Sequence, residues 1–249
     1  MKATKASFTH CRAERGYNAP MNDSTDSIIK AGTDGRRAQC ATCLRAASAC
    51  ICHWIQPLAA APVGRATVLI LQHPMEVANA KNSARLLHLC LPGSRLVAGE
   101  TFDNLDALLA GPHRPVLLYP DTPGDDAAGI APARFDPAAG GAAGGAMGND
   151  ILLVVLDATW RKSRKMLYLN PALQTLPRLA LRDVPVSHYL IRKAHAPGQL
   201  STLEATAYAL AQLDNGEAGG AGRFAPLIAA FDGFVGQQQA LEAAHRAGR

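Results

Sequence analysis

The sequence predicts an α/β protein with a mainly parallel sheet and helices on both faces. Its apolar runs, such as "ILLVVL" at 151–156, are continuous rather than alternating, as in strands that are buried on both sides. Segments with helical patterns separate these runs along the chain. Of the 249 residues, 48% are hydrophobic, which suffices for a sizeable core in one large domain or two small ones. No apolar run reaches the roughly 18 residues of a transmembrane helix, so no membrane association is expected.

The first half of the α/β region predicts three strands and two helices. Residues 66–74, "ATVLILQHP", read as a buried strand that Pro74 ends. Two further strands, each preceded by a helix, are expected after it. They are a helix at 77–93 closed by Pro-Gly, a strand at 94–100, a helix at 103–111 with Asp103 as its cap, and a strand at 114–121.

The second half begins with a Gly-Ala stretch at 137–149, which predicts a flexible surface insertion. Residues 150–158 form the strongest strand pattern, and a basic helix should follow to about Leu169, before Pro171. Residues 176–195 look like short strands and turns. Ser201 and Glu204 form a capping box for a helix that Asn215-Gly216 ends, and a last helix is expected at 223–247.

The first 39 residues are polar and poor in core residues, which predicts a disordered tail, and Met21 is a second candidate start. The N-terminus has no signal-peptide pattern, so a soluble, cytoplasmic protein is expected. The predicted division of the chain is a tail at 1–39, a cysteine module at 40–57 and an α/β domain at 65–240.

Four of the six cysteines lie in the short stretch "CATCLRAASACIC", namely Cys40, Cys43, Cys50 and Cys52. Four thiolates this close together suit a tetrahedral zinc ion, which they would hold without an open position for water. A structural zinc site is therefore the main prediction. A redox cluster or a pair of disulfides is the alternative, although an intracellular location disfavours disulfides.

Polar or constrained residues stand where three of the predicted strands end. In open α/β sheets, ligands bind beyond the carboxyl ends of the strands, so these ends predict a site. A carboxylate at such an end, such as Asp157, is a base, a ligand for an amine, or a cap for the next helix. Trp160 and Tyr119 either stack on a ligand or are simply buried. The three groups are Gln72, His73 and Glu76; Tyr119, Pro120 and Asp121; and Asp157, Thr159 and Trp160.

The chain's positive charge is concentrated in one segment. Between Asp157 and His195 there are eight Lys or Arg residues against two Asp, an excess that accounts for the whole formal charge of +5. A localised basic zone indicates a polyanionic partner, and a solvated basic helix is the alternative.

These pieces together resemble the DTW-domain family, which is named for an Asp-x-Thr-Trp signature. The resemblance covers residues 40–235 and rests on five motifs in one order. They are the cysteine cluster, "QHPMEVANAKNSARLL" at 72–87, "LLYP" at 117–120, "LDATW" at 156–160 and "LSTLEA" at 200–205. The departures are Ala158, where the family often has Gly, and Ser83, where it often has Thr; neither removes a reactive group.

The resemblance implies a tRNA-uridine aminocarboxypropyltransferase. Such an enzyme transfers the 3-amino-3-carboxypropyl group of S-adenosylmethionine to N3 of a uridine, which gives acp3U and 5′-methylthioadenosine. The implied fold is SPOUT-like, with a C-terminal trefoil knot that holds the cofactor; knots are rare, and the sequence pattern itself does not predict one.

The resemblance also implies the site. Asp157 is the candidate base, with the cofactor amine and the helix cap as its other roles. Cofactor contacts are expected from Leu118, Tyr119, Pro120, Asp157, Thr159, Trp160, Ser201 and Thr202. RNA phosphates are expected at Arg161, Lys162, Arg164, Lys165, Arg192 and Lys193. The partner is tRNA, and no obligate protein partner is implied.

Three other functions remain open from the sequence. One is the same transfer to ribosomal RNA, another is methyl transfer by a SPOUT relative, and the third is a non-catalytic, zinc-containing RNA-binding protein. Aminocarboxypropyl transfer and methyl transfer differ in their by-products: the first releases methylthioadenosine, and the second releases S-adenosylhomocysteine. A simple RNA binder would not need three polar strand ends around one pocket.

Overall fold

The computed structural model describes residues 38–58, 66–120, 133–136, 151–187, 199–214 and 218–248. Contacts divide the chain into two compact units, Met1–Cys52 and His53–Arg249. The expected disordered tail lies almost wholly outside the described residues, and so do the insertion at 137–149 and the turns at 188–195. The three-part division into tail, module and α/β domain stays a prediction.

The larger unit is built on a parallel sheet, as predicted. Its five strands lie in the order β2-β1-β4-β3-β5, and every neighbouring pair is parallel. β1 and β4 lie side by side at its centre and are buried along almost their whole length. The strands are β1 Ala66–Gln72, β2 Arg95–Ala98, β3 Arg114–Leu118, β4 Ile151–Asp157 and β5 Arg178–Leu179.

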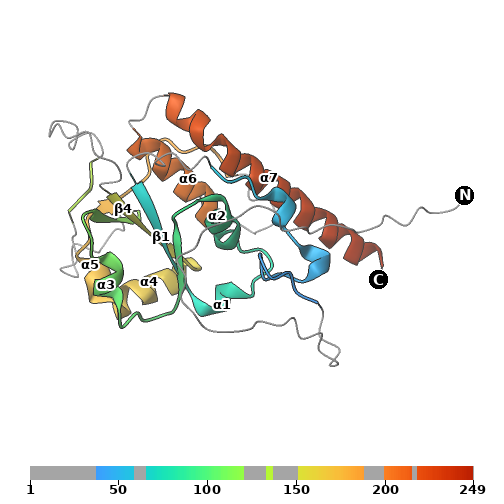
Figure 1. Cartoon of the computed structure of the whole chain (residues 1–249), viewed down its shortest axis with the longest axis horizontal. Helices are drawn as coiled ribbons and strands as arrows, with labels where there is room; N and C mark the ends of the chain where they lie inside the picture. Colours follow the sequence, from blue (N-terminus) through green and yellow to red (C-terminus); the bar gives the residue numbers. More distant parts are fainter. Residues whose placement is uncertain are drawn as a thin grey trace, which may run out of the picture. The chain divides into compact units, whose positions relative to one another are not determined.

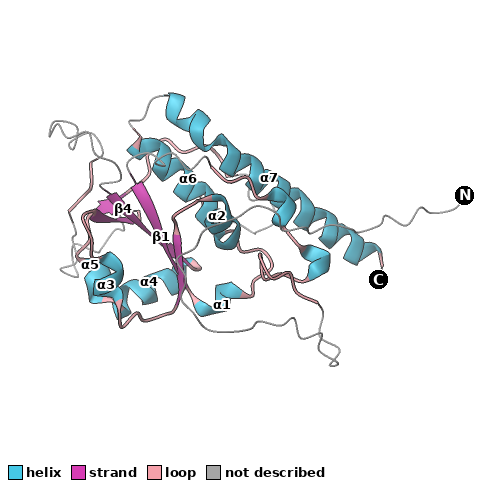
Figure 2. Ribbon diagram, in the orientation of Figure 1, coloured by secondary structure: helices cyan, strands magenta, loops and turns pink. Residues whose placement is uncertain are grey.

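Helices cover the sheet in two groups, which Figure 1 and Figure 2 show on either side of β1 and β4. Side chains alternate across each strand, so Leu69 and Val154 pack on one group while Ile70 and Val155 face the other. The first group is α3 Leu105–Leu109, α4 Trp160–Leu169 and α5 Pro171–Gln174. The second group is α2 Ala84–Cys90 and α6 Thr202–Leu213, with the long α7 Ala218–Ala247 packed on α6.

One predicted helix is wrong in its extent. The helix expected at 77–93 is present only as α2 Ala84–Cys90, and a turn separates it from α1 Pro74–Val77, which ends where the predicted helix begins. The side chain of Asn79 accepts from the backbone N–H of Lys81, and that of Asn82 accepts from Ala84. These local bonds compete with the backbone hydrogen bonds of a helix. The segment between α1 and α2 is therefore a turn, although its apolar residues have helical spacing.

The predicted cap at Asp103 is also wrong, because α3 starts after Asn104. By contrast, the capping box of Ser201 and Glu204 is present at the start of α6, as predicted. No helix in the described part of the chain is long and apolar enough to cross a membrane. The expected trefoil knot is not shown by the described residues and stays a prediction.

Candidate active site

The site begins where β1 and β4 end beside each other. Gln72, the last residue of β1, is the register partner of Asp157, the last residue of β4. By the alternation along each strand, both side chains lie on the face of the sheet that α2 and α6 cover. The predicted meeting of polar residues at the strand ends is therefore present for this pair.

Asp157 links four segments through its carboxylate. Its Oδ2 accepts from Gln72 Nε2 at 2.8 Å and from Asn82 Nδ2 at 2.6 Å. Its Oδ1 accepts from Thr202 Oγ1, on the first turn of α6, at 2.7 Å. The residue is only 3% exposed. A carboxylate with three donors is held in one orientation, which suits a residue at a reaction centre.

Burial raises the pKa of Asp157 above its ordinary value, because desolvation penalises the charged carboxylate. The hydrogen bonds from Thr202, Gln72 and Asn82 oppose this shift, and the negative charge of Glu76 adds to it. The net effect is upward, so the carboxylate binds a proton more readily than an exposed aspartate does.

Asp157 does not occupy the N-cap position of the helix that follows it, α4. Thr159 is the N-cap of α4, in an extended conformation, and its side chain makes no capping bond. The carboxylate of Asp157 instead bonds to segments on the α2 and α6 side of the sheet. Its contacts are thus those of a site residue more than those of a cap for α4.

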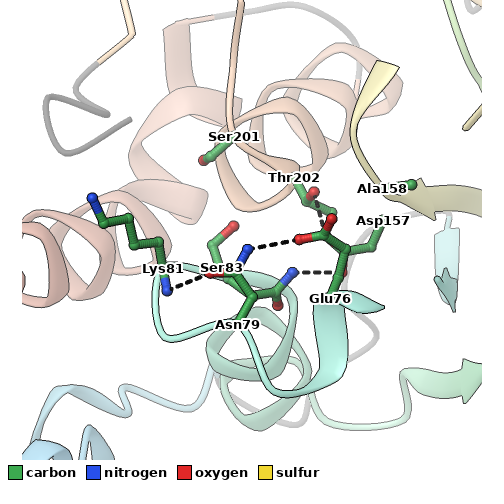
Figure 3. Close-up of a pocket in the computed structure, with 9 residues that line it drawn as sticks. Glu76, Asn79, Lys81, Ser83, Asp157, Ala158, Ser201 and Thr202 are labelled. Carbon is green, nitrogen blue, oxygen red and sulfur yellow. Dashed lines mark hydrogen bonds between the residues drawn. The ribbon is translucent and has the colours of Figure 1, made fainter. Parts of the chain in front are cut away.

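A small cavity lies beside Asp157. Its volume is about 60 Å³, and Figure 3 shows its lining from β4, the α1–α2 turn and the start of α6. Three of the predicted site residues line it: Asp157, Ser201 and Thr202. The complete lining is Glu76, Asn79, Lys81, Asn82, Ser83, Asp157, Ala158, Ser201 and Thr202.

Glu76 is the second buried carboxylate in this lining and is 4% exposed. It lies on α1, which begins directly after β1 because Pro74 occupies the first helical position and His73 caps it. Its Oε1 accepts from the Lys162 ammonium at 3.0 Å, and its Oε2 accepts from Asn79 Nδ2 at 2.9 Å. One partner lies on α4 and the other in the turn after α1, so the carboxylate is held in one orientation.

The N-terminus of α6 is largely satisfied by protein side chains. The backbone N–H of Glu204 donates to Ser201 Oγ, and that of Leu203 donates to Ser83 Oγ. Glu204 is fully buried and accepts from the Ser201 N–H and from the Ser187 hydroxyl. These bonds place Ser201 and Thr202 firmly in the cavity wall, but they use donors that an anion would otherwise bind.

Tyr119 and Trp160 stack on each other outside the cavity lining. Their ring centroids are 5.3 Å apart, and the guanidinium of Arg178 lies 5.2 Å from the Tyr119 ring. Tyr119 is buried, as one predicted alternative has it, while Trp160 is 47% exposed. Stacking of either ring on a ligand stays a prediction. Leu118, Pro120 and Thr159 also lie outside the lining.

The basic residues of α4 differ in their exposure and in whether they pair with a glutamate. Arg161, Arg164 and Lys165 are exposed, as their helical spacing suggests. Lys162 is instead paired with Glu76, and Lys165 is paired with Glu100 at 3.0 Å. Glu100 also accepts from His73, whose ring caps α1, so His73 braces the backbone beside the site. Arg192 and Lys193 lie outside the described residues.

In the smaller unit, the sulfur atoms of Cys40, Cys43, Cys50 and Cys52 lie within 4.8 Å of one another. Cys40 Sγ is 3.5 Å from Cys52 Sγ, and Cys43 Sγ is 3.8 Å from Cys50 Sγ. Four ligands at about 2.3 Å from a tetrahedral zinc would be about 3.8 Å apart, so the cluster fits this ion. Against the effect of burial, hydrogen bonds from the Cys43 and Thr42 backbone lower the pKa of Cys40 to about 6.

Sequence reasoning named Gln72 and Glu76 at a strand end but assigned them no role, and it missed Asn79, Asn82 and Ser83. A signal for them exists in "QHPMEVANAKNS", where polar residues interrupt an otherwise helical pattern. Asn at two positions three residues apart indicates turns rather than a continuous helix.

A parallel α/β sheet with a polar cavity at the ends of its central strands is the arrangement of α/β proteins that bind a small ligand. The DTW-domain model matches residues 37–239, and the chain belongs to this family. No solved structure matches the chain.

Three relatives are each named tRNA-uridine aminocarboxypropyltransferase 2. The Drosophila melanogaster protein is 32% identical over 196 residues, which cover 75% of this chain and 71% of the relative. The Mus musculus protein is 28% identical and the Macaca fascicularis protein is 28% identical, each over 78% of this chain. The match spans 65% of the mouse protein and 63% of the macaque protein, slightly less than two thirds of each.

Proposed function

We propose that this protein transfers the 3-amino-3-carboxypropyl group of S-adenosylmethionine to N3 of a uridine in tRNA. The products are acp3U and 5′-methylthioadenosine. Support comes from family membership and from relatives that are named for this activity over most of this chain. The observation that carries the proposal is the buried, triply bonded Asp157 of the family signature in the wall of a polar cavity.

In the proposed reaction, the N3–Cγ bond forms while the bond from Cγ to the sulfonium sulfur breaks. The sulfonium supplies an activated carbon and a good leaving group, and its electron pair stays on sulfur. Asp157 accepts the N3 proton, since its raised pKa makes it a better base than an exposed aspartate. A carboxylate has about four lone-pair positions, and three donors to Asp157 are described, which is compatible with this role.

The donor is proposed to lie across the carboxyl ends of β3 and β4. Ser201 and Thr202 would face its amino acid part from the cavity wall, where Asp157 also lies. Leu118, Tyr119, Pro120, Thr159 and Trp160 would contact its nucleoside part, and the stacked rings of Tyr119 and Trp160 offer an apolar surface for it. A SPOUT-like knot around this position is part of the proposal, and the parallel sheet is compatible with it.

The RNA is proposed to bind over α4, where Arg161, Arg164 and Lys165 are exposed. Lys162 and Lys165 are weaker phosphate ligands than we expected, because Glu76 and Glu100 already pair with them. Arg192 and Lys193 complete the proposed phosphate contacts. Reaction at N3 requires that the uridine be unpaired and accessible, as in a loop or after flipping.

Zn²⁺ is the proposed metal for the cysteine cluster, because four thiolates at these separations match its preferred tetrahedral site. Its role would be structural, since four protein ligands leave no position for substrate. Reduced thiols also agree with the proposed cytoplasmic location. Metal analysis of the purified protein should find one zinc per chain, and its loss in a Cys43→Ser variant would support these ligands.

The activity is tested by incubating the protein with S-adenosylmethionine and unmodified tRNA. Mass spectrometry of the nucleosides should detect acp3U, and methylthioadenosine should appear in equal amount. S-adenosylhomocysteine as the by-product would instead indicate methyl transfer. Modification of ribosomal RNA but not tRNA would indicate the other acceptor, and binding of tRNA without any product would contradict the proposal.

A further inference from the structure

Glu76 is a buried carboxylate in the cavity wall to which the proposed reaction assigns no part. It lies on α1, four residues after the end of β1, and faces the same space as Asp157 in Figure 3. With 4% of its surface exposed, it is as deeply buried as the residues of the core. Carboxylates are rarely buried to this degree unless they bind a cation or several donors.

The cavity as a whole suits a small cation. Its side chains are polar except for Ala158, and it has neither an aromatic ring nor a large apolar group that would hold a nucleobase. Two of the lining residues are acidic. The one basic residue in the lining, Lys81, has its ammonium 2.6 Å from Glu242 on α7, and Figure 3 shows this side chain extending away from Asp157. Lys162, the partner of Glu76, does not line the cavity, so the charged groups that face it are the two carboxylates.

The proposed reaction uses Asp157 for the N3 proton, which leaves Glu76 as the carboxylate of the cavity wall for an ammonium. Both oxygens of Asp157 accept from the amides and hydroxyl that position it, at 2.6 to 2.8 Å. Glu76 also accepts at both oxygens, and one of its donors is an ammonium, that of Lys162, at 3.0 Å. Asn79 holds its other oxygen, so the carboxylate is oriented before any ligand enters.

We propose that Glu76 binds the α-ammonium of the 3-amino-3-carboxypropyl group of the donor, an inference that rests on the proposed function. Anchoring this end of the donor restrains Cγ relative to Asp157 more directly than it restrains the methyl group, which is two bonds further along the chain. Glu76 is then a residue that determines which substituent of the sulfonium is transferred.

Two nucleosides test this role through binding alone. S-adenosylhomocysteine carries the ammonium, and methylthioadenosine lacks the whole amino acid part. A hydrogen bond to a charged group is worth about 1.5–3 kcal/mol, so Glu76→Gln should weaken S-adenosylhomocysteine binding by about 10- to 100-fold. The affinity for methylthioadenosine should stay within about twofold of wild type. Isothermal titration calorimetry with the full chain measures both.

Glu100→Gln is the matched control, since Glu100 is also paired with a lysine of α4 but does not line the cavity. It should leave both affinities unchanged. Because Glu76→Gln leaves the Lys162 ammonium without its partner, the double variant Glu76→Gln/Lys162→Gln restores the charge balance. It should melt close to the wild-type temperature and still bind S-adenosylhomocysteine weakly.

Wild-type affinity of both Glu76 variants for S-adenosylhomocysteine would overturn the inference. An equal loss of affinity for the two nucleosides would overturn it too, because the defect would then not concern the ammonium. A wild-type protein that binds neither nucleoside would instead refute the proposed function, on which the inference depends.

Discussion

At the scale of single residues, Asp157 has two roles: it holds neighbouring segments through hydrogen bonds, and it is the proposed base. Replacement by Asn separates these roles. In Asp157→Asn, the amide oxygen can still accept from Gln72 and Asn82, while the new NH₂ group can donate to the Thr202 hydroxyl, which turns to accept. The fold should therefore survive. If Asp157 is the base, turnover should fall by about 100-fold or more with little change in donor affinity. Single-turnover kinetics and calorimetry measure the two quantities, and wild-type turnover would rule out the base.

The same substitution has a pH-dependent effect on stability. Burial raises the pKa of Asp157 in the folded protein, so the folded state binds a proton more tightly than the unfolded state. Stability due to this group is then present below its unfolded pKa of about 4 and is lost as pH rises toward the folded value. Relative to wild type, Asp157→Asn should become more favourable to stability as pH rises from about 4 to neutral.

Glu242→Gln serves as the control, because its effect on stability should change with pH in the opposite direction. The hydrogen bond from Lys81 lowers the pKa of Glu242, so its contribution is present above its ordinary pKa and is lost on acidification. Thermal unfolding of both variants across this pH range checks the pair. Parallel pH profiles for the two variants would show that burial does not set the proton affinity of Asp157.

Asp157 was predicted as a site residue from its place at a strand end, whereas Ser201 and Thr202 were predicted from the family resemblance. The sequence could not predict that Gln72 and Asn82 bond to Asp157, since that depends on β1 lying next to β4 and in register with it. Nor could it show that Lys162 turns inward to Glu76. The helical repeat predicts on which face of α4 a side chain lies, but not which residue of another element it contacts.

At the scale of elements, α7 illustrates how a helix depends on one close contact. Its Gly233 lies against the indole ring of Trp54, and a Cβ at this position would overlap the ring. Trp54 Nε1 also donates to Gln237 Oε1 at 2.7 Å, so the ring has little freedom to move. Gly233→Ala should therefore destabilise the protein by about 1–3 kcal/mol despite the better helix propensity of Ala.

Gly236, on the same helix, is the matched control because a Cβ there meets nothing within 4 Å. Gly236→Ala should stabilise the protein by about 0.5–1 kcal/mol through helix propensity alone. Urea unfolding of both variants gives the two free energies. A stabilising effect at both positions would mean that Trp54 does not pack on Gly233 as described.

Most of the elements of the larger unit were predictable, since β1, β4 and α6 carry continuous apolar runs or a capping box. The failure at 77–93 has a cause in local hydrogen bonds, whereas at the start of α3 the N-cap Asn104 makes no side-chain capping bond. Asn and Asp form local bonds with the backbone, so these residues both start and interrupt helices. Which of the two occurs depends on tertiary partners such as Asp157, which holds the Asn82 side chain.

At the scale of the whole molecule, the formal charge of +5 and its concentration after Asp157 explain how a polyanion would find the site. The helix α4, which carries four of the eight basic residues of this segment, begins three residues after Asp157. A phosphate backbone lying along its exposed side would therefore bring an unpaired uridine close to the cavity. Affinity for tRNA should then depend strongly on salt.

Arg164 tests this arrangement because it is exposed on α4. Each phosphate contact contributes about 0.7–0.9 to the slope of log affinity against log salt, so Arg164→Ala should reduce the slope by about that amount. Arg223→Ala removes the same charge from α7, where Asp214 pairs with Arg223 at 3.1 Å, and should change the slope much less. Filter binding of tRNA from 50 to about 200 mM salt measures both slopes. Equal slopes for Arg164→Ala and wild type would place the RNA elsewhere, whereas equal reductions in the two variants would mean that only net charge matters.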